Sequence, residues 1–312
     1  MTGITSWILA WHVRLCGRVI SAALLAGVVS ASLPGDVAHA QEDQGLRNHI
    51  LGIGNCPPWN PQALEVCYNS LERVVGALSP RLDAEPDAVH LLINEGASAS
   101  ALKLKVTELA NGLGSNDRLI IYANLPLGQL ETEQAEEVNG YILEFWANEQ
   151  PETAADAISE GTWISAPAFA AMIHTIPAAE VILMLDTNNS YAVNMHLLDT
   201  HSVDHKGRPE ALVSSAGAGQ TANYSADRTI SLFAKHLALA LEETDGSLQD
   251  VMTIAVGGTR QAAIPICAAL KEHKEETSEP SADCQQVPQI HDPSAILNET
   301  MLLPIVETVP TE

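Results

Sequence analysis

Five consecutive apolar residues, Val181-Ile-Leu-Met-Leu185, run directly into the polar stretch Asp186-Thr187-Asn188-Asn189-Ser190. An apolar run of this length, without alternation, is typical of a strand that is buried on both faces of a parallel sheet. In doubly wound sheets, ligands bind at the carboxyl ends of the strands. We therefore expect the residues that follow Leu185 to lie at the binding or active site.

Further segments with regular patterns lie on both sides of this strand. Strands are predicted at 49–54, 88–93, 118–122 and 211–215, and helices at 61–78, 98–113, 165–176, 229–242 and 247–256. Strand and helix alternate through the first half of the chain, which favours a parallel sheet with helices on both faces. Residues 140–146 are expected to form an edge hairpin or a loop.

A secretory signal is predicted for residues 1–40. Arg14 and Arg18 precede the apolar run 19–29, and residues 38–40 match a small-residue cleavage site. A retained membrane anchor is the alternative, but about eleven apolar residues are few against the roughly 20 that a bilayer requires. We therefore expect a protein that is exported to a periplasm or secreted, with no membrane contact after signal removal.

The chain is strongly acidic, with 39 Asp and Glu against 15 Lys and Arg and a formal net charge of −24 at pH 7. Nucleic acid and anionic lipid are not expected partners, because binding them requires Lys and Arg to neutralise phosphates. The acidity favours solubility or attracts basic partners.

Glu, Ser, Pro, Asp and Gln dominate from about residue 271. We therefore predict one domain at 41–270 and an acidic, mostly flexible tail at 271–312 with at most one short ordered segment.

Four cysteines remain once Cys16 leaves with the signal. In an oxidising compartment they permit two disulfides, with Cys56–Cys67 and Cys267–Cys284 as the local pairing among three arrangements. A free thiol at Cys67 is the alternative.

Several segments carry a family resemblance through their order and spacing. They are Gly52-Ile-Gly54, Leu64-Glu-Val-Cys67-Tyr-Asn69-Ser70, His90-Leu-Leu-Ile-Asn-Glu-Gly-Ala97, Asn116-Asp117-Arg118-Leu-Ile-Ile-Tyr122, the stretch 181–190, and Leu212-Val-Ser-Ser-Ala216 with Gly219-Gln-Thr-Ala222. Across residues 48–260 they resemble caspases, metacaspases and their bacterial, orthocaspase-like relatives. The resemblance implies an α/β fold, a caspase-like three-layer sandwich whose central, mostly parallel sheet has about six strands and helices on both faces.

The departures from that family fall on its catalytic dyad. Where the family has Asp-x-Cys-His-Ser-Gly, this chain has Asn188 in place of the cysteine, and Pro126 stands where the family has its histidine. Proline has no titratable group and asparagine is a very poor nucleophile. Neither the general base nor the nucleophile of a thiolate peptidase therefore remains at these positions. No histidine lies between His90 and His174, so sliding the alignment does not restore the pair.

The family's substrate pocket is partly retained. In members that cleave after Arg or Lys, the cationic side chain is held by an acidic residue two before the nucleophile, by a helix aspartate and by a serine. Asp186 matches the first position, Ser70 and Asn124 replace the other two, and Cys67 matches a pocket cysteine. Alternatively, Asp186 only caps the loop at the end of its strand.

Other site chemistries are weaker. His196, His201 and His205 with Asp199 and Asp204 match no metal-binding spacing on a helix or strand, so no metal is expected. Ser214 and Ser215 lack a G-x-S-x-G elbow, and Gly52-Ile-Gly54 lacks the third glycine of a dinucleotide fingerprint, so no cofactor is expected.

The leading hypothesis is an exported pseudo-peptidase that has lost proteolytic activity. It would bind a peptide or protein partner, including one with basic side chains, through the old substrate cleft. One alternative is an active cysteine-type endopeptidase relative that uses unassigned residues. Another is an envelope interaction module that works through its acidic tail.

Overall fold

The structure is a computed structural model that describes residues 45–56, 58–129, 140–195, 207–277 and 284–305. The predicted signal at 1–40 and the histidine-rich segment at 196–205 lie outside these residues. Residues 45–312 cluster as one compact unit.

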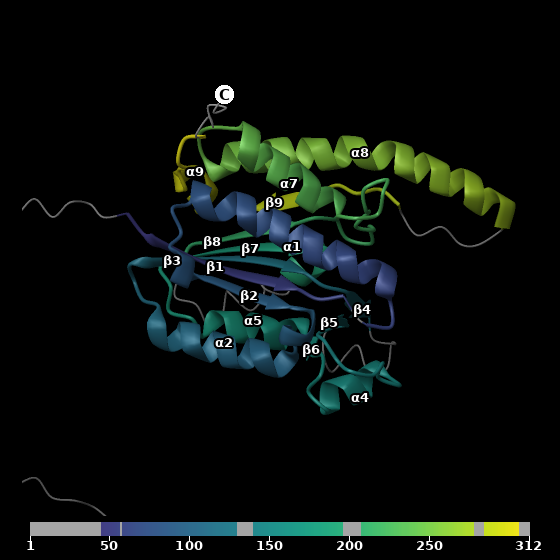
Figure 1. The fold of residues 1–312 in the computed structure, drawn as a ribbon, viewed down its shortest axis with the longest axis horizontal. Coiled ribbons are helices and arrows are strands. Elements are labelled where there is room, and N and C mark those ends of the chain that lie inside the picture. Colours follow the sequence, from purple (N-terminus) through teal and green to yellow (C-terminus); the bar gives the residue numbers. More distant parts are fainter. Residues whose placement is uncertain (1–44, 57, 130–139, 196–206, 278–283, 306–312) are drawn as a thin grey trace, which may run out of the picture. The chain divides into compact units, whose positions relative to one another are not determined.

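A six-stranded sheet forms the centre of this unit (Figure 1). In spatial order its strands are β2 (Val89–Ile93), β1 (Arg47–Gly54), β3 (Asp117–Asn124), β7 (Glu180–Asp186), β8 (Glu210–Ser214) and β9 (Gln289–His291). The first five strands are parallel, and β9 pairs antiparallel with β8. The predicted α/β sandwich, with a central sheet of six mostly parallel strands, is confirmed.

Helices cover both faces of this sheet (Figure 1). One face packs against α1 (Pro61–Arg81), α7 (Leu232–Glu243), α8 (Leu248–Thr277) and the short α9 (Ile296–Glu299), and the other against α2 (Ala99–Gly112) and α5 (Ala166–His174). Side chains of β3 alternate between the two cores, because successive strand residues point to opposite faces. Leu119 and Ile121 enter the core under α2, whereas Ile120 and Tyr122 enter the core under α1.

A small antiparallel sheet follows β3 in the chain. It contains β4 (Leu127–Gln129), β5 (Tyr141–Leu143) and β6 (Ile164–Ser165), and the short helix α4 (Ala154–Ser159) lies between β5 and β6 in sequence. Single 3-10 turns at Pro86–Ala88 and Asn94–Gly96 flank β2. Residues 140–146 thus contribute β5 to this second sheet.

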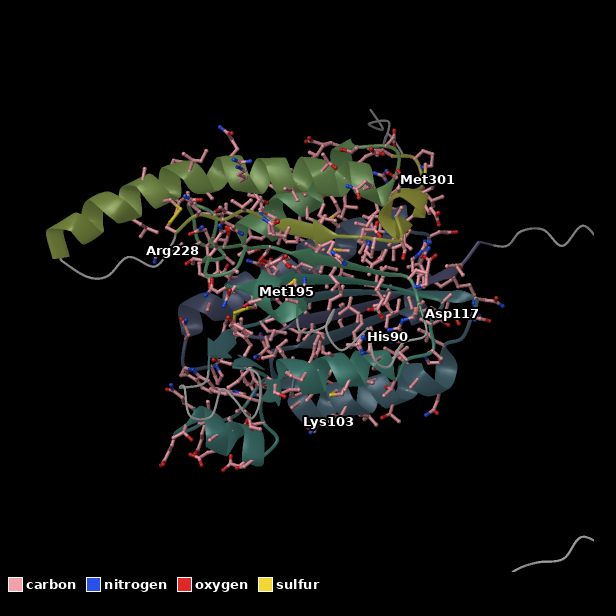
Figure 2. The ribbon with its side chains drawn as sticks, turned by 180° about the vertical axis from the view of Figure 1, so that it is seen from behind. His90, Lys103, Asp117, Met195, Arg228 and Met301 are labelled. Atoms are coloured by element: carbon pink, nitrogen blue, oxygen red, sulfur yellow. A yellow bond between two sulfur atoms is a disulfide. The ribbon has the colours of Figure 1, made fainter. Side chains whose placement is uncertain are left out.

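Charged residues close the amino edge of the main sheet. Asp117, labelled in Figure 2, is buried and accepts an ion pair from Arg47 at 2.8 Å. Its other carboxylate oxygen accepts a hydrogen bond from the Gly114 N–H at 2.7 Å. Arg118 pairs with Glu180 at 2.6 Å on the neighbouring strand. These charged groups are paired with one another, so we assign them a structural role.

The end of the chain corrects the predicted domain boundary. The mostly flexible tail predicted from residue 271 is wrong for the part that the structure describes, because α8 continues to Thr277 and β9 extends the sheet. Ile296 and Leu297 of α9 are almost fully buried in the core with α7 and α8. The domain therefore extends to Ile305.

Both disulfides of the local pairing are formed, Cys56–Cys67 and Cys267–Cys284. The alternative of a free thiol at Cys67 is therefore wrong. The second disulfide joins α8 to the segment that leads into β9.

Helix α8 is also long and apolar enough, over Leu248–Leu270, to cross a membrane by length and composition alone. Val251, Met252 and Ala255 of this stretch are fully buried in the core beside α7. A core helix meets the same criterion, and burial explains Val251, Met252 and Ala255, whereas Ile254 is 52% exposed.

Candidate functional site

The candidate site lies at the carboxyl edge of the main sheet. Parallel register pairs Gly54 of β1 with Asn124 of β3, and Asn124 with Asp186 of β7, so three strands end side by side. A cavity of about 300 Å³ opens beyond these ends. Of the residues predicted from the sequence, it is lined by Cys67, Asn124, Pro126, Asp186 and Asn188.

Asp186 is the buried acid of this cavity. Its Oδ2 accepts hydrogen bonds from the Tyr122 hydroxyl at 2.7 Å, from Asn124 Nδ2 at 3.0 Å and from the Ser231 hydroxyl. Its Oδ1 is buried and has no hydrogen-bond partner among the described residues. Burial raises the pKa of Asp186, although the three donors oppose that rise.

The Ser231 hydroxyl connects Asp186 to the start of α7. It accepts the Ala234 N–H at 2.9 Å as the N-cap of that helix, and it donates its own proton to Asp186. The Ser231 N–H in turn donates to Ser70 Oγ at 3.0 Å. Ser70 is therefore buried behind Ser231 and does not line the cavity. Its part in the predicted pocket is indirect.

Asn188 and Asn189 hold a loop in place. Asn188 Oδ1 accepts the Ala222 N–H at 2.7 Å, and Asn189 Oδ1 accepts the Gly219 N–H at 2.7 Å. Asn189 has a φ of 56°, a left-handed conformation that asparagine tolerates better than most residues. Both amides thus bind the backbone of residues 217–222, and Asn188 uses its side chain for this contact at the edge of the cavity.

A thiolate peptidase requires a free cysteine and a histidine, and the described residues that line the cavity supply neither. Cys56 and Cys67 both line the cavity, but they are joined to each other as a disulfide. No histidine is among the described residues that line it. No group of three metal-ligating side chains occurs within the described ranges either.

Sequence reasoning missed several lining residues, which include Ser231, one acid and two aromatic residues. Glu144 lies just after β5, Trp59 lies in the loop before α1, and Tyr224 lies in the loop before α7. Burial raises the pKa of Glu144, and burial together with the nearby charge of Asp186 raises the pKa of Tyr224. Glu144 had a detectable signal, because it is the one acid in the apolar run 141–146.

The comparisons with known proteins concern the fold. Neither a family model nor a curated protein matches this sequence. Among solved structures, protein GSU0716 from Geobacter sulfurreducens is similar with a TM-score of 0.52 and 14% identity, over 83% of this chain and 100% of that chain. Caspase-1 from Spodoptera frugiperda is similar with a TM-score of 0.42 and 11% identity, over 85% of this chain and 96% of that chain.

The pKa of Asp186 leads to a prediction on pH. Its pKa in the folded protein is raised above the ordinary 3.8, so ionisation adds no penalty to folding while both states are protonated. As pH rises above about 4, the unfolded state ionises first, and the folded state loses stability. We expect the melting temperature of Asp186→Asn, measured relative to the unmodified protein, to increase from about pH 4 to about pH 7.

Asp87→Asn is the matched control, because Asp87 is exposed. Its difference in melting temperature from the unmodified protein should not grow with pH. A constant or falling difference for Asp186→Asn over the same range would contradict the raised pKa.

Proposed function

We propose that this protein is a pseudo-peptidase, which binds a peptide or protein partner in the cavity at the carboxyl edge of the sheet and does not cleave it. One observation carries the proposal. Pro126 and Asn188, at the positions of the family's histidine and cysteine, line a single cavity in which the two cysteines form a disulfide. Recognition is therefore the function that the cavity supports best.

The lining favours a partner with a basic side chain. Asp186 and Glu144 supply two carboxyl groups, and no Lys or Arg is among the described lining residues. A cation bound beside them would favour their ionised forms, which offsets part of the cost of their burial. Trp59 and Tyr224 add aromatic rings to the same lining, and such rings attract cations.

Export is part of the proposal. Two disulfides in one domain suit an oxidising compartment such as a periplasm or the cell exterior, and the predicted signal at 1–40 suits the same destination. The net charge of −24 opposes nucleic acid and favours basic partners through long-range attraction.

Binding of a peptide library that cannot be cleaved tests this function. We expect peptides with Arg or Lys to bind about 10-fold more tightly than the same peptides with citrulline, which keeps the shape of Arg without its charge; this ratio corresponds to about 1.4 kcal/mol. Glu144→Gln should reduce the preference, because it removes one of the two carboxyl groups.

Glu160→Gln removes the same charge from an exposed position outside the cavity and serves as the control. It should leave the preference for Arg unchanged. Equal affinity for Arg and citrulline peptides would contradict a cation site. Absence of binding to every peptide would contradict the proposed function itself.

A further inference from the structure

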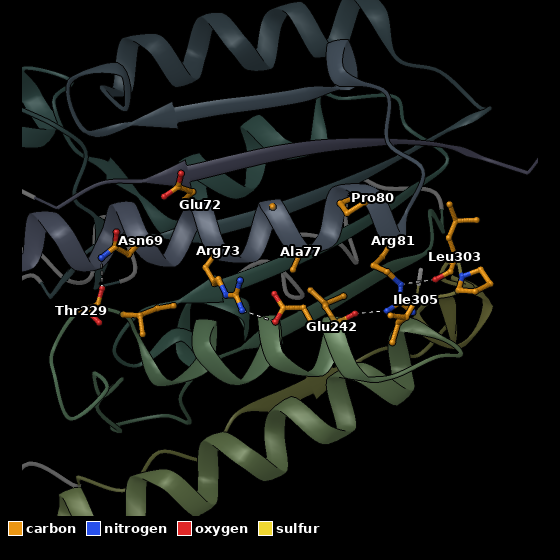
Figure 3. Close-up of a pocket in the computed structure, with 14 residues that line it drawn as sticks. Asn69, Glu72, Arg73, Ala77, Pro80, Arg81, Thr229, Glu242, Leu303 and Ile305 are labelled. Carbon is orange, nitrogen blue, oxygen red and sulfur yellow. Dashed lines mark hydrogen bonds and ion pairs between the residues drawn. The ribbon is translucent and has the colours of Figure 1, made fainter. Parts of the chain in front are cut away.

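Helix α8 is the outermost helix of its layer. On this face of the sheet α7 lies between α1 and α8 (Figure 1). Arg73 of α1 pairs with Glu242 of α7 at 2.6 Å, as the dashed line in Figure 3 shows. The other side of α7 packs against the first half of α8, and the second half of α8 extends beyond α7 (Figure 1). One side of α8 is thus covered by α7, and the opposite side carries exposed residues.

The exposed side of α8 carries a regular row of residues. At alternating spacings of three and four, this row contains Ile254, Gly257, Gln261, Ile264 and Ala268, all of them exposed. Such spacing places residues on one stripe of a helix, as in the contact positions of a coiled coil. The side chains of Ile254 and Ile264 are large and apolar, yet these residues are 52% and 59% exposed. We call this row the α8 seam.

The α8 seam lies in an almost uncharged stretch of an acidic chain. From residue 251 to residue 270 the sequence contains no Asp or Glu, and Arg260 is its one charged residue. Two copies that each carry a net charge of −24 repel one another through most of their surface. Contact at the seam brings no two carboxylates together, and the centres of protein interfaces are poor in charge. A second copy therefore suits the seam better than the hollow in Figure 3, which Glu72 and Glu242 line.

We propose that two copies of this protein associate through their α8 seams, with the two helices antiparallel. Two-fold symmetry makes each contact occur twice. With Ile254 of one copy against Ile264 of the second copy, the same alignment places Gly257 against Gln261. The long Gln261 side chain then covers the glycine of the other helix. A parallel pair would instead place Gly257 against Gly257 and leave a void between the helices.

A hollow beside the seam gives room for a side chain of the second copy. Its volume is about 430 Å³, and it is lined by Ile264 and Ala268 of α8 and by Val287 of the segment that leads into β9. Ile254 of the second copy, placed against Ile264, lies next to this hollow. Association thus removes from water the two largest apolar side chains of each seam.

Sedimentation velocity of the purified protein at increasing concentration tests the dimer. We expect reversible association, because a single pair of helices is a small interface. Added salt should strengthen it, because salt screens the repulsion between two acidic copies. Ile264→Glu should weaken association about 10-fold or more, since it places a carboxylate at the central apolar contact.

Leu104→Glu is the matched control for this variant. Leu104 is 63% exposed on α2, which packs on the other face of the sheet. The change introduces the same charge at a similarly exposed apolar residue, so association should stay as in the unmodified protein.

Disulfide crosslinking tests the orientation and leaves both isoleucines in place. A Cβ at Gly257 meets no atom within 4 Å, so Gly257→Cys fits without displacing a neighbour. A mixture of Gly257→Cys and Gln261→Cys proteins should form crosslinked dimers faster than either variant alone, because antiparallel helices place residue 257 against residue 261.

Several results would overturn the α8 dimer. A protein that is monomeric at every concentration would do so, as would Ile264→Glu associating as strongly as Leu104→Glu. Crosslinking of each cysteine variant alone as fast as in the mixture would contradict the antiparallel arrangement. A monomer that binds phosphatidylcholine vesicles, and loses this binding in Ile264→Glu, would assign the seam to a membrane surface instead.

Discussion

Leu297→Ala is expected to lower the free energy of unfolding by about 2–5 kcal/mol, the range for a fully buried leucine whose removal leaves a cavity. Leu297 has 0% exposure and packs in the core beneath α7 and α8, although it lies far into the acidic segment that composition assigns to a flexible tail. Urea unfolding followed by circular dichroism measures the change.

Met301→Ala is the matched control, because Met301 lies four residues further on and is 66% exposed. Its free energy of unfolding should change by less than about 0.5 kcal/mol. If Leu297→Ala behaved like Met301→Ala, the segment 284–305 would not belong to the folding unit. An interaction module working through a free tail would then regain support.

Asp186→Ala is expected to destabilise the protein by about 2–4 kcal/mol. The substitution leaves the buried donors of Tyr122, Asn124 and Ser231 without their shared acceptor. Removing a buried acid whose pKa is raised by desolvation recovers part of that loss, so the expected effect is smaller than the sum of three broken hydrogen bonds.

Asp186→Ala both breaks three hydrogen bonds and removes a buried acid, and thermal or urea unfolding of two further variants distinguishes these two effects. Asp186→Asn keeps a carbonyl oxygen for the three donors and should lose less stability than Asp186→Ala. Asp87→Ala, at an exposed position, should stay within about 0.5 kcal/mol of the unmodified protein. If Asp186→Ala were as stable as Asp87→Ala, the network of Tyr122, Asn124 and Ser231 would not depend on this carboxylate.

β1, β3, β7 and β8 could be predicted because each is an apolar run that the sheet buries over most of its length. The edge strand β2 was predicted from its apolar run too, although it is only partly buried. β9 could not be predicted, because its three residues, Gln289–His291, are only partly buried and gain their place from pairing with β8. The predicted helix at 247–256 stopped too early at Gly257 and Gly258. In the structure a Cβ on Gly258 would lie 2.6 Å from Nδ1 of His236, so this glycine permits close contact between α8 and α7 and does not end the helix.

The candidate site was predictable where it depends on strand ends. Asn124 and Asp186 finish neighbouring strands, and the loop residues Pro126 and Asn188 follow them directly. Trp59 and Tyr224 were missed because they come from loops, whose position at the cavity depends on the packing of α1 and α7. Ser70 was predicted to line the pocket, but Ser231 lies between Ser70 and the cavity, and helical spacing does not reveal this.

Turnover of a fluorogenic peptide library, with Arg, Lys or Asp before the scissile bond, tests the central claim most directly. The same purified protein should bind the uncleavable versions of the Arg and Lys peptides. We predict that no peptide is hydrolysed faster by this protein than by its Asp186→Ala variant, because Pro126 and Asn188 supply neither a general base nor a nucleophile. Hydrolysis clearly above that of Asp186→Ala would contradict the pseudo-peptidase account and would point to a nucleophile elsewhere in the chain.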